Sequence, residues 1–206
     1  MAMTLTTPNT LLGTLQPKGD TARLASNLVT VVLGTVLLTI AAKIQVPTWP
    51  VPVTLQSLAV AGLAAAFGAR IGVATLALYI LEGMAGLPVF AGAGAGAAYI
   101  LGPTGGFIIG WLAMAYIIGR AADMGASRSF PKLFGAMILG NAFSFALGFI
   151  WLAAMAGSAG WIDQSNILGS AFAKAVQPFI VWDVLKMALA ALSVVGGWQL
   201  IKSGKA

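Results

Sequence analysis

The sequence predicts an all-α polytopic membrane protein with six transmembrane helices, and composition is the first observation behind this prediction. Hydrophobic residues make up 59% of the 206 residues and charged residues only 8%, and the mean hydropathy is +0.95. Soluble domains average about 25% charged residues, so this chain has too few charges to cover a water-facing surface. At roughly 20 residues per span, six spans need about 120 residues, which leaves the remainder for loops.

The second observation is a series of six apolar runs. Three prolines separate the first run from the second, where a helix cannot continue, and a Gly/Ala-rich segment separates the third from the fourth. The second run is short for a bilayer, so we expect it to be tilted or partly buried. We expect residues 1–23 to form a cytoplasmic arm and residues 24–206 a single transmembrane domain, with spans at residues 24–42, 53–67, 71–86, 104–122, 133–156 and 176–201.

The basic residues predict the orientation. Cytoplasmic loops of membrane proteins carry an excess of Lys and Arg, so both termini are expected in the cytoplasm, with the loops after the first, third and fifth spans outside. This topology accounts for the net charge of +6, and we expect no nucleic-acid partner. Eight of the eleven basic residues lie next to span ends that this topology places on the cytoplasmic side: Lys18, Arg23, Arg70, Arg120, Arg128, Lys132, Lys202 and Lys205.

The sequence contains neither cysteine nor histidine. Disulfides and thiolate metal sites are therefore excluded, and the commonest general base and metal ligand is missing. We expect neither an enzyme nor a resident metal or cofactor.

Two charged residues lie inside the sixth predicted span. A charge in mid-membrane costs roughly 2.5–3.5 kcal/mol on insertion scales, so such residues usually face the bundle interior and serve a site. Asp183 and Lys186 are three residues apart, which puts them on one helix face. If the helix begins near Pro178, the pair lies one to two turns below the outer surface. It is either an anchor for a small ligand that enters from outside or an ion pair that holds helices together.

Two outward loops have unusual compositions. Residues 46–52 are stiff and apolar around Trp49, and form either a lid or an ordinary loop with an aromatic residue at the membrane interface. Residues 92–98 contain only Gly and Ala, so backbone there can approach a ligand closely, or the segment is a flexible spacer. Gln56 and Asn141 are candidate hydrogen-bonding groups of a pocket, or bridges between helices.

Small residues recur every four positions in two spans, at Gly102, Gly106 and Gly110, and at Gly140, Ser144 and Gly148 with Ala136 before them. Such stripes allow helices to approach closely in lipid. We expect them to mark packing inside the bundle.

Three short stretches together resemble the signature of one family. They are residues 51–56 (VPVTLQ), 86–91 (GLPVFA) and 101–107 (LGPTGGF). In this order and at this separation they are similar to the BioY family, the biotin-specific S components of energy-coupling-factor (ECF) transporters. The resemblance extends from about Ile40 to the end of the sixth span. It implies an S-component-like bundle of six helices in a bacterial plasma (inner) membrane, with an outward-facing pocket and no catalytic activity.

The family motif in the sixth span is Gly-Asp-x-x-Lys. This chain has Asp183 and Lys186 at the matching positions, and Trp182 where the family has glycine. The resemblance therefore implies a ligand-binding role for Asp183 and Lys186.

The chemistry of biotin suits these residues. Its ureido ring has two N–H donors that a carboxylate can accept, and an ammonium can bind the ring carbonyl or the valerate carboxylate. Apolar Phe90, Trp49 and Tyr99 could enclose the ring and tail. The candidate substrate-binding residues are Asp183, Lys186, Phe90, Gly92, Tyr99, Gln56, Trp49 and Asn141.

The resemblance also implies partners, namely a transmembrane T protein and two ABC-type ATPases. The chain has no Walker A sequence, so ATP hydrolysis must come from such partners. The alternative is a solitary secondary transporter or facilitator of biotin or another small vitamin, with Asp183 or Glu82 as the proton-coupling carboxylate. A homo-oligomer is the form expected of a chain that acts without an energising module.

Overall fold

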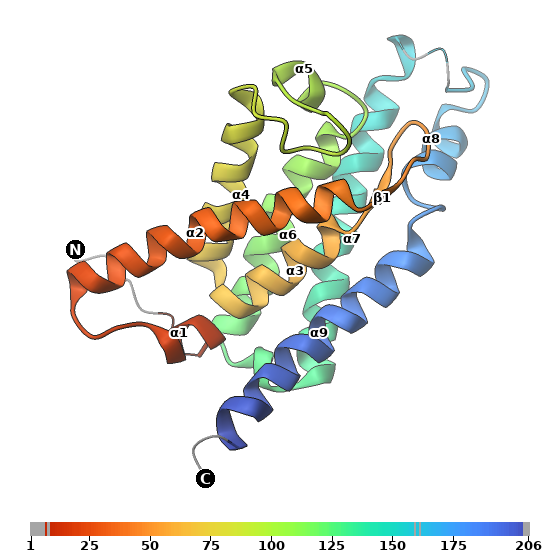
Figure 1. The fold of residues 1–206 in the computed structure, drawn as a ribbon. Coiled ribbons are helices and arrows are strands. Elements are labelled where there is room, and N and C mark those ends of the chain that lie inside the picture. Colours follow the sequence, from red (N-terminus) through yellow and green to blue (C-terminus); the bar gives the residue numbers. More distant parts are fainter. Residues whose placement is uncertain (1–6, 8, 159, 161, 204–206) are drawn as a thin grey trace.

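Six long helices carry the fold in the computed structural model, which describes residues 7, 9–158, 160 and 162–203 (Figure 1). They follow the six predicted spans in order and confirm the predicted fold class. They are α2 (Asp20–Lys43), α3 (Gln56–Phe67), α4 (Ala69–Met84), α6 (Gly105–Asp123), α7 (Phe130–Ala154) and α9 (Ile180–Ser203). The shorter elements are α1 (Leu11–Leu15), α5 (Ala97–Ile100), α8 (Ile167–Ala175), the 3-10 turns η1 (Ala126–Arg128) and η2 (Ala156–Ser158), and the strands β1 (Gln45–Val46) and β2 (Val53–Thr54).

The long helices differ in their capacity to cross a bilayer. Among the described residues, four regions are long and apolar enough to do so, namely α2, α6, α7 and the region Ile167–Ile201 that contains α8 and α9. Helix α3 has 12 residues and α4 has 16. At 1.5 Å per residue, α3 spans about 18 Å of a hydrocarbon core that is about 30 Å thick. The second predicted span is therefore short, as expected.

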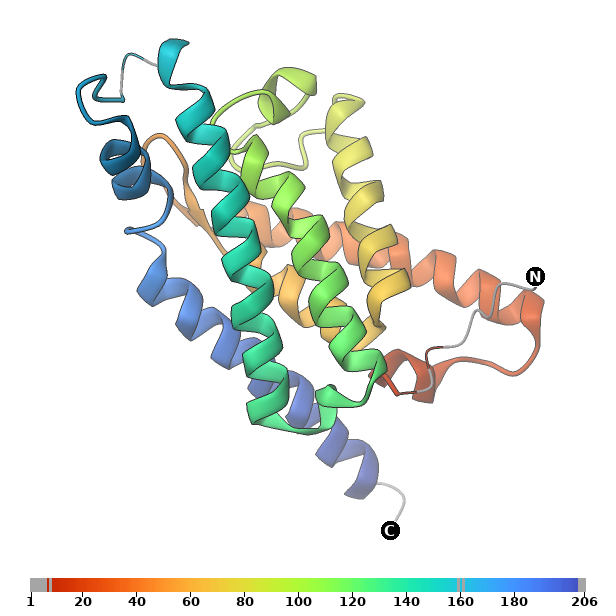
Figure 2. The same cartoon turned by 180° about the vertical axis from the view of Figure 1, so that it is seen from behind.

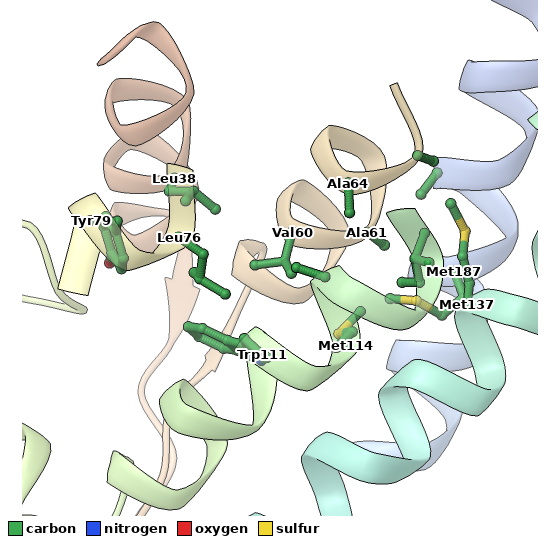
Figure 3. Close-up of a cluster of buried hydrophobic side chains, with 14 of the residues drawn as sticks. Leu38, Val60, Ala61, Ala64, Leu76, Tyr79, Trp111, Met114, Met137 and Met187 are labelled. Carbon is green, nitrogen blue, oxygen red and sulfur yellow. The ribbon is translucent and has the colours of Figure 1, made fainter. Parts of the chain in front are cut away.

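The core lies around α6, which packs against α3, α4 and α7. Figure 3 shows side chains from α2, α3, α4, α6, α7 and α9 in one cluster, with Met114, Met137 and Met187 close together at the side formed by α6, α7 and α9. The glycine stripes pack as predicted. A Cβ on Gly106 would overlap Trp151, and a Cβ on Gly110 would lie 2.8 Å from the Ser144 backbone. Close approach of α6 and α7 thus depends on these glycines.

The segment before the first predicted span contains structure of its own. Thr10 caps α1 by accepting a hydrogen bond from the Gly13 amide, and Leu12 is buried. Asn9 donates to the Asp123 carbonyl at 2.8 Å. The described part of residues 1–23 therefore packs against the bundle, and α2 begins at Asp20 rather than at residue 24.

The opposite end of the bundle, at the top of Figures 1 and 2, carries three covering elements. The proline-rich segment folds as a β1–β2 hairpin in which Gln45 pairs with Thr54. Residues 85–96 with α5 form a second cover, and α8 forms a third. Helix α8 is an element that the sequence prediction missed. Because Pro178 interrupts the apolar run, α9 begins at Ile180 instead of continuing from α8.

Candidate functional site

A small chamber lies beneath the hairpin, between the N-terminal ends of α3, α6 and α9 and the C-terminal half of α7. Its volume is about 50 Å³, enough for only a few water molecules at roughly 10–15 Å³ each. Six of the eight predicted site residues line it: Asp183, Lys186, Phe90, Tyr99, Gln56 and Asn141. The other lining residues are Val51, Pro52, Thr54, Ser57, Ala91, Thr104, Phe107, Ile108, Trp111, Ser144, Phe145 and Phe179.

The two charged residues of α9 form a buried ion pair at one side of the chamber. Lys186 Nζ lies 2.6 Å from Asp183 Oδ1, and the side chains are only 11% and 6% exposed. Ser57 on α3 donates to the same oxygen at 3.0 Å and accepts from Lys186 at 3.4 Å. No described residue donates to Asp183 Oδ2. The pair therefore keeps an acceptor, and a part of the ammonium, for another molecule.

The start of α9 positions this pair. Asp183 lies in the first turn, where the positive end of the helix dipole stabilises a carboxylate. Trp182, which stands where the family motif has glycine, is 59% exposed and does not line the chamber. The change from glycine therefore leaves the polar lining intact.

Gln56 lines the chamber but is largely engaged with its neighbours. Its amide nitrogen donates to the Tyr79 hydroxyl at 2.7 Å, and its amide oxygen accepts from Thr54 at 3.1 Å. Tyr79 in turn donates to the Val89 carbonyl at 2.8 Å. Gln56 thus links α3 to α4 and to the cover formed by residues 85–96.

Asn141 presents the opposite case. Its residue is only 5% exposed, yet no hydrogen-bond partner for its amide is found within the described ranges. The amide is not among the fully enclosed polar atoms that lack a partner, so it reaches the open space of the chamber. Because Asn141 faces the chamber from α7, a ligand is the natural partner for its donors and acceptor.

An aromatic wall closes the chamber on the side of residues 85–96. The rings of Phe90 and Tyr99 stack with centroids 4.9 Å apart, and Phe90 meets Tyr79 edge-on at 5.5 Å. A Cβ on Gly83 would overlap the Phe90 ring, so this glycine provides the space for it. Burial raises the pKa of Tyr99 above its usual value, which keeps its hydroxyl neutral.

Trp49 and Gly92 lie elsewhere. They line an outer groove of about 400 Å³ between the hairpin tip and the cover formed by residues 85–96. Trp49 is 73% exposed. Pro52, Ala91, Tyr99 and Thr104 line both the groove and the chamber. The groove thus adjoins the chamber on its outer side, and these four residues separate the two spaces.

Several lining residues were missed by the sequence prediction. The sequence could have indicated Ser57, because this residue directly follows Gln56 in an otherwise apolar span. It could also have indicated Phe107, which ends one of the stretches that carry the family resemblance. Phe145 and Phe179, which flank Phe107 at 6.5 Å and 6.0 Å, look like ordinary lipid-facing aromatics in the sequence. Among the described residues, no group of three or more acidic, His or Cys side chains could hold a metal ion.

Comparison with known proteins identifies the family of this chain. Residues 12–203 match the sequence model of the BioY family. This chain belongs to the BioY family. It is 35% identical over 162 residues to a probable biotin transporter BioY of Pyrococcus horikoshii, covering 79% of this chain and 90% of that protein. It is 33% identical to a biotin transporter BioY of Thermotoga maritima, covering 77% and 87%.

The fold of this BioY family member resembles a solved structure. The crystal structure of an S component for biotin from an ECF-type ABC transporter superposes with a TM-score of 0.73 at 26% identity, covering 89% of this chain and 95% of that one. The family resemblance drawn from the three motif stretches is therefore confirmed, and so is the S-component-like bundle.

Proposed function

We propose that this chain is the biotin-binding transmembrane subunit of an energy-coupling-factor transporter. It captures biotin from the outer side and works with an ABC-type energising module. The observation that carries this proposal is the chamber beneath the hairpin, in which a buried Asp–Lys pair faces an aromatic wall. The family membership and the likeness to a biotin S component support the same function.

The polar groups of the chamber match the polar groups of biotin. Asp183 Oδ2 accepts from a ureido N–H, and Lys186 binds either the ureido carbonyl or the valerate carboxylate. The Asn141 amide supplies one donor pair and one acceptor beside them. Phe90 and Tyr99 pack against the apolar parts of biotin. All eight residues predicted from the sequence contribute, with Gln56 acting mainly through Tyr79, and with Trp49 and Gly92 acting in the outer groove.

Biotin binding requires the chamber to widen. Ligand pockets usually measure roughly 300–1,000 Å³, and the chamber measures about 50 Å³. The groove of about 400 Å³ lies directly outside it. Biotin therefore enters through the groove, and the residues that separate the two spaces move aside during its entry.

The orientation follows the same scheme, with the hairpin and the chamber at the outer face and both termini in the cytoplasm. The basic residues between α3 and α4 and between α6 and α7 then lie inside, as the positive-inside rule requires. The partners are a transmembrane T protein and two ABC-type ATPases, because the chain itself has no nucleotide-binding motif.

Uptake of labelled biotin by cells that express the chain tests this function. We expect uptake that competes with unlabelled biotin but not with thiamin or riboflavin, survives ionophores and stops on ATP depletion. Uptake that stops with ionophores while ATP remains high would instead favour a solitary secondary transporter. No biotin uptake with the energising module present would refute the proposal.

A further inference from the structure

One lysine donates hydrogen bonds to three backbone carbonyls of the cover formed by residues 85–96. Lys43, in the last turn of α2, donates to the carbonyls of Pro88, Phe90 and Gly92 at 2.5, 2.7 and 2.7 Å. An ammonium has three N–H donors. All three N–H donors of Lys43 therefore bind carbonyls within one stretch of five residues, 88–92.

The carbonyls of the two intervening residues, Val89 and Ala91, also accept hydrogen bonds. The Val89 carbonyl accepts from Tyr79 at 2.8 Å, and the Ala91 carbonyl accepts from the Gly94 amide at 3.0 Å. Every carbonyl from residue 88 to residue 92 thus has a donor. Lys43 supplies three of the five, and its bonds are charge-assisted, so they are about twice as strong as neutral ones.

The same stretch forms part of the wall between the chamber and the groove, because Ala91 lines both spaces. Phe90 and Ala91 line the chamber, and Ala91 and Gly92 line the groove. Biotin cannot reach Asp183 without displacing part of this wall or the facing hairpin. A group that holds the wall in place therefore controls how biotin enters and leaves.

Lys43 is also attached to the facing wall. It lies two residues before Gln45, where the hairpin begins, and the hairpin contributes Val51 and Pro52 to the chamber. A lysine in the last helical turn commonly interacts with the helix's own final carbonyls. Here its ammonium instead joins the end of α2 to the opposite wall of the site.

Glycines lie at both ends of the stretch that Lys43 holds, at positions where hinges can form. Gly86, Gly92 and Gly96 have φ values of 100°, 62° and 82°, which side chains rarely adopt. Gly86 and Gly96 flank this stretch, and the Gly96 amide donates to the Gly83 carbonyl at 2.7 Å. Hinges of this kind absorb backbone rotation when a loop opens.

We propose that Lys43 is a positioning residue that latches residues 88–92 closed over bound biotin. It does not touch biotin, and it acts by stabilising the closed arrangement of the two walls. The inference rests on the proposed biotin function for its kinetic consequence. The latch itself is a property of the ligand-free protein and can be measured without biotin.

The test compares Lys43→Met with Lys174→Met in the purified full-length chain. Lys174 lies in the last turn of α8 at the same end of the bundle, and no described residue pairs with it, so its variant makes the same charge change away from the latch. Without biotin, we expect amide hydrogen exchange in residues 86–96 to speed up about tenfold or more in Lys43→Met. Exchange in Lys174→Met should match the wild type.

Biotin kinetics provide the second readout. In Lys43→Met we expect both association and dissociation to accelerate, dissociation more strongly, so that affinity falls about tenfold. Ethylammonium added to Lys43→Ala should slow both exchange and dissociation, because its cation can occupy the three carbonyls. A lysine that only stabilised the fold would leave the rates of biotin association and dissociation of the folded protein unchanged. The variant Lys43→Gln keeps one donor group and should fall between wild type and Lys43→Met, which covers the case in which Lys43→Met folds poorly.

Unchanged exchange in residues 86–96 of Lys43→Met would overturn the latch. So would an unchanged dissociation rate in a variant whose exchange has increased. If the wild type itself fails to bind biotin, the proposed function fails, while the exchange measurement still decides whether Lys43 holds the cover.

Discussion

Removing one member of the Asp183–Lys186 pair is expected to cost more stability than removing both charges. Lys186 Nζ lies 2.6 Å from Asp183 Oδ1, and the side chains of Asp183 and Lys186 are 6% and 11% exposed. Breaking such a buried pair by removing one partner costs roughly 3–5 kcal/mol, whereas replacing both charges is often near neutral. Asp183→Asn and Lys186→Met should therefore each destabilise by that amount. The double variant should lose less stability than the sum of the two single losses, by at least about 2 kcal/mol.

Biotin binding should behave differently, and this separates a ligand role from a structural one. Each single variant removes a charged partner worth about 1.5–3 kcal/mol, which is roughly a 10- to 150-fold loss of affinity. The double variant recovers stability but not binding. Thermal unfolding in detergent and calorimetric titration with biotin measure the two quantities. Glu82→Gln is the matched control, because Glu82 accepts from Thr35 at 3.1 Å and lies outside the chamber. Strictly additive stability losses would show that the two charges are not coupled, and wild-type affinity in either single variant would exclude a ligand-binding role for the pair.

Three further changes test the lining of the chamber. Gly83→Ala forces the Phe90 ring out of place, so biotin affinity should fall about tenfold or more. Gly62→Ala, whose Cβ meets nothing within 4 Å, should bind normally and gain roughly 0.5–1 kcal/mol of stability. Asn141→Leu should weaken biotin binding about tenfold or more without loss of thermal stability, because the amide has no partner among the described residues. Trp182→Gly should leave affinity within about twofold, since a change confined to an exposed side chain is worth at most about 0.5 kcal/mol. Calorimetry and thermal unfolding decide each case, and a reversed result in any of them would contradict the geometry described.

Much of the fold was predictable because lipid imposes a simple rule on sequence. Six apolar runs could be counted, and a run without charges in lipid has few alternatives to a helix. The missed elements are those that lipid does not dictate. The nine residues of α8 belong to the same apolar stretch as α9, so only the turn around Pro178 separates them. Helix α1 depends on one Thr10 cap, which is a weak signal in a polar segment.

The site was predictable where chemistry is costly and less so where geometry decides. Asp183 and Lys186 stood out because buried charge in a span needs a purpose. Gln56 lines the chamber, but its bond to Tyr79 joins residues 23 apart in the chain, and nothing in the sequence indicates this bond. Trp49 lies in the outer groove because the hairpin turn carries it outward. The role of Lys43 could not be predicted, since its three acceptors are backbone carbonyls that have no sequence signature.

Titration of the purified protein with biotin, with thiamin and riboflavin as controls, is the most direct test of biotin binding by this chain. We expect saturable binding of one biotin per chain, with an affinity that falls roughly 10- to 150-fold in Asp183→Asn, and no binding of either control. Failure of the folded wild-type protein to bind biotin, or equal binding of thiamin or riboflavin, would contradict the proposed function.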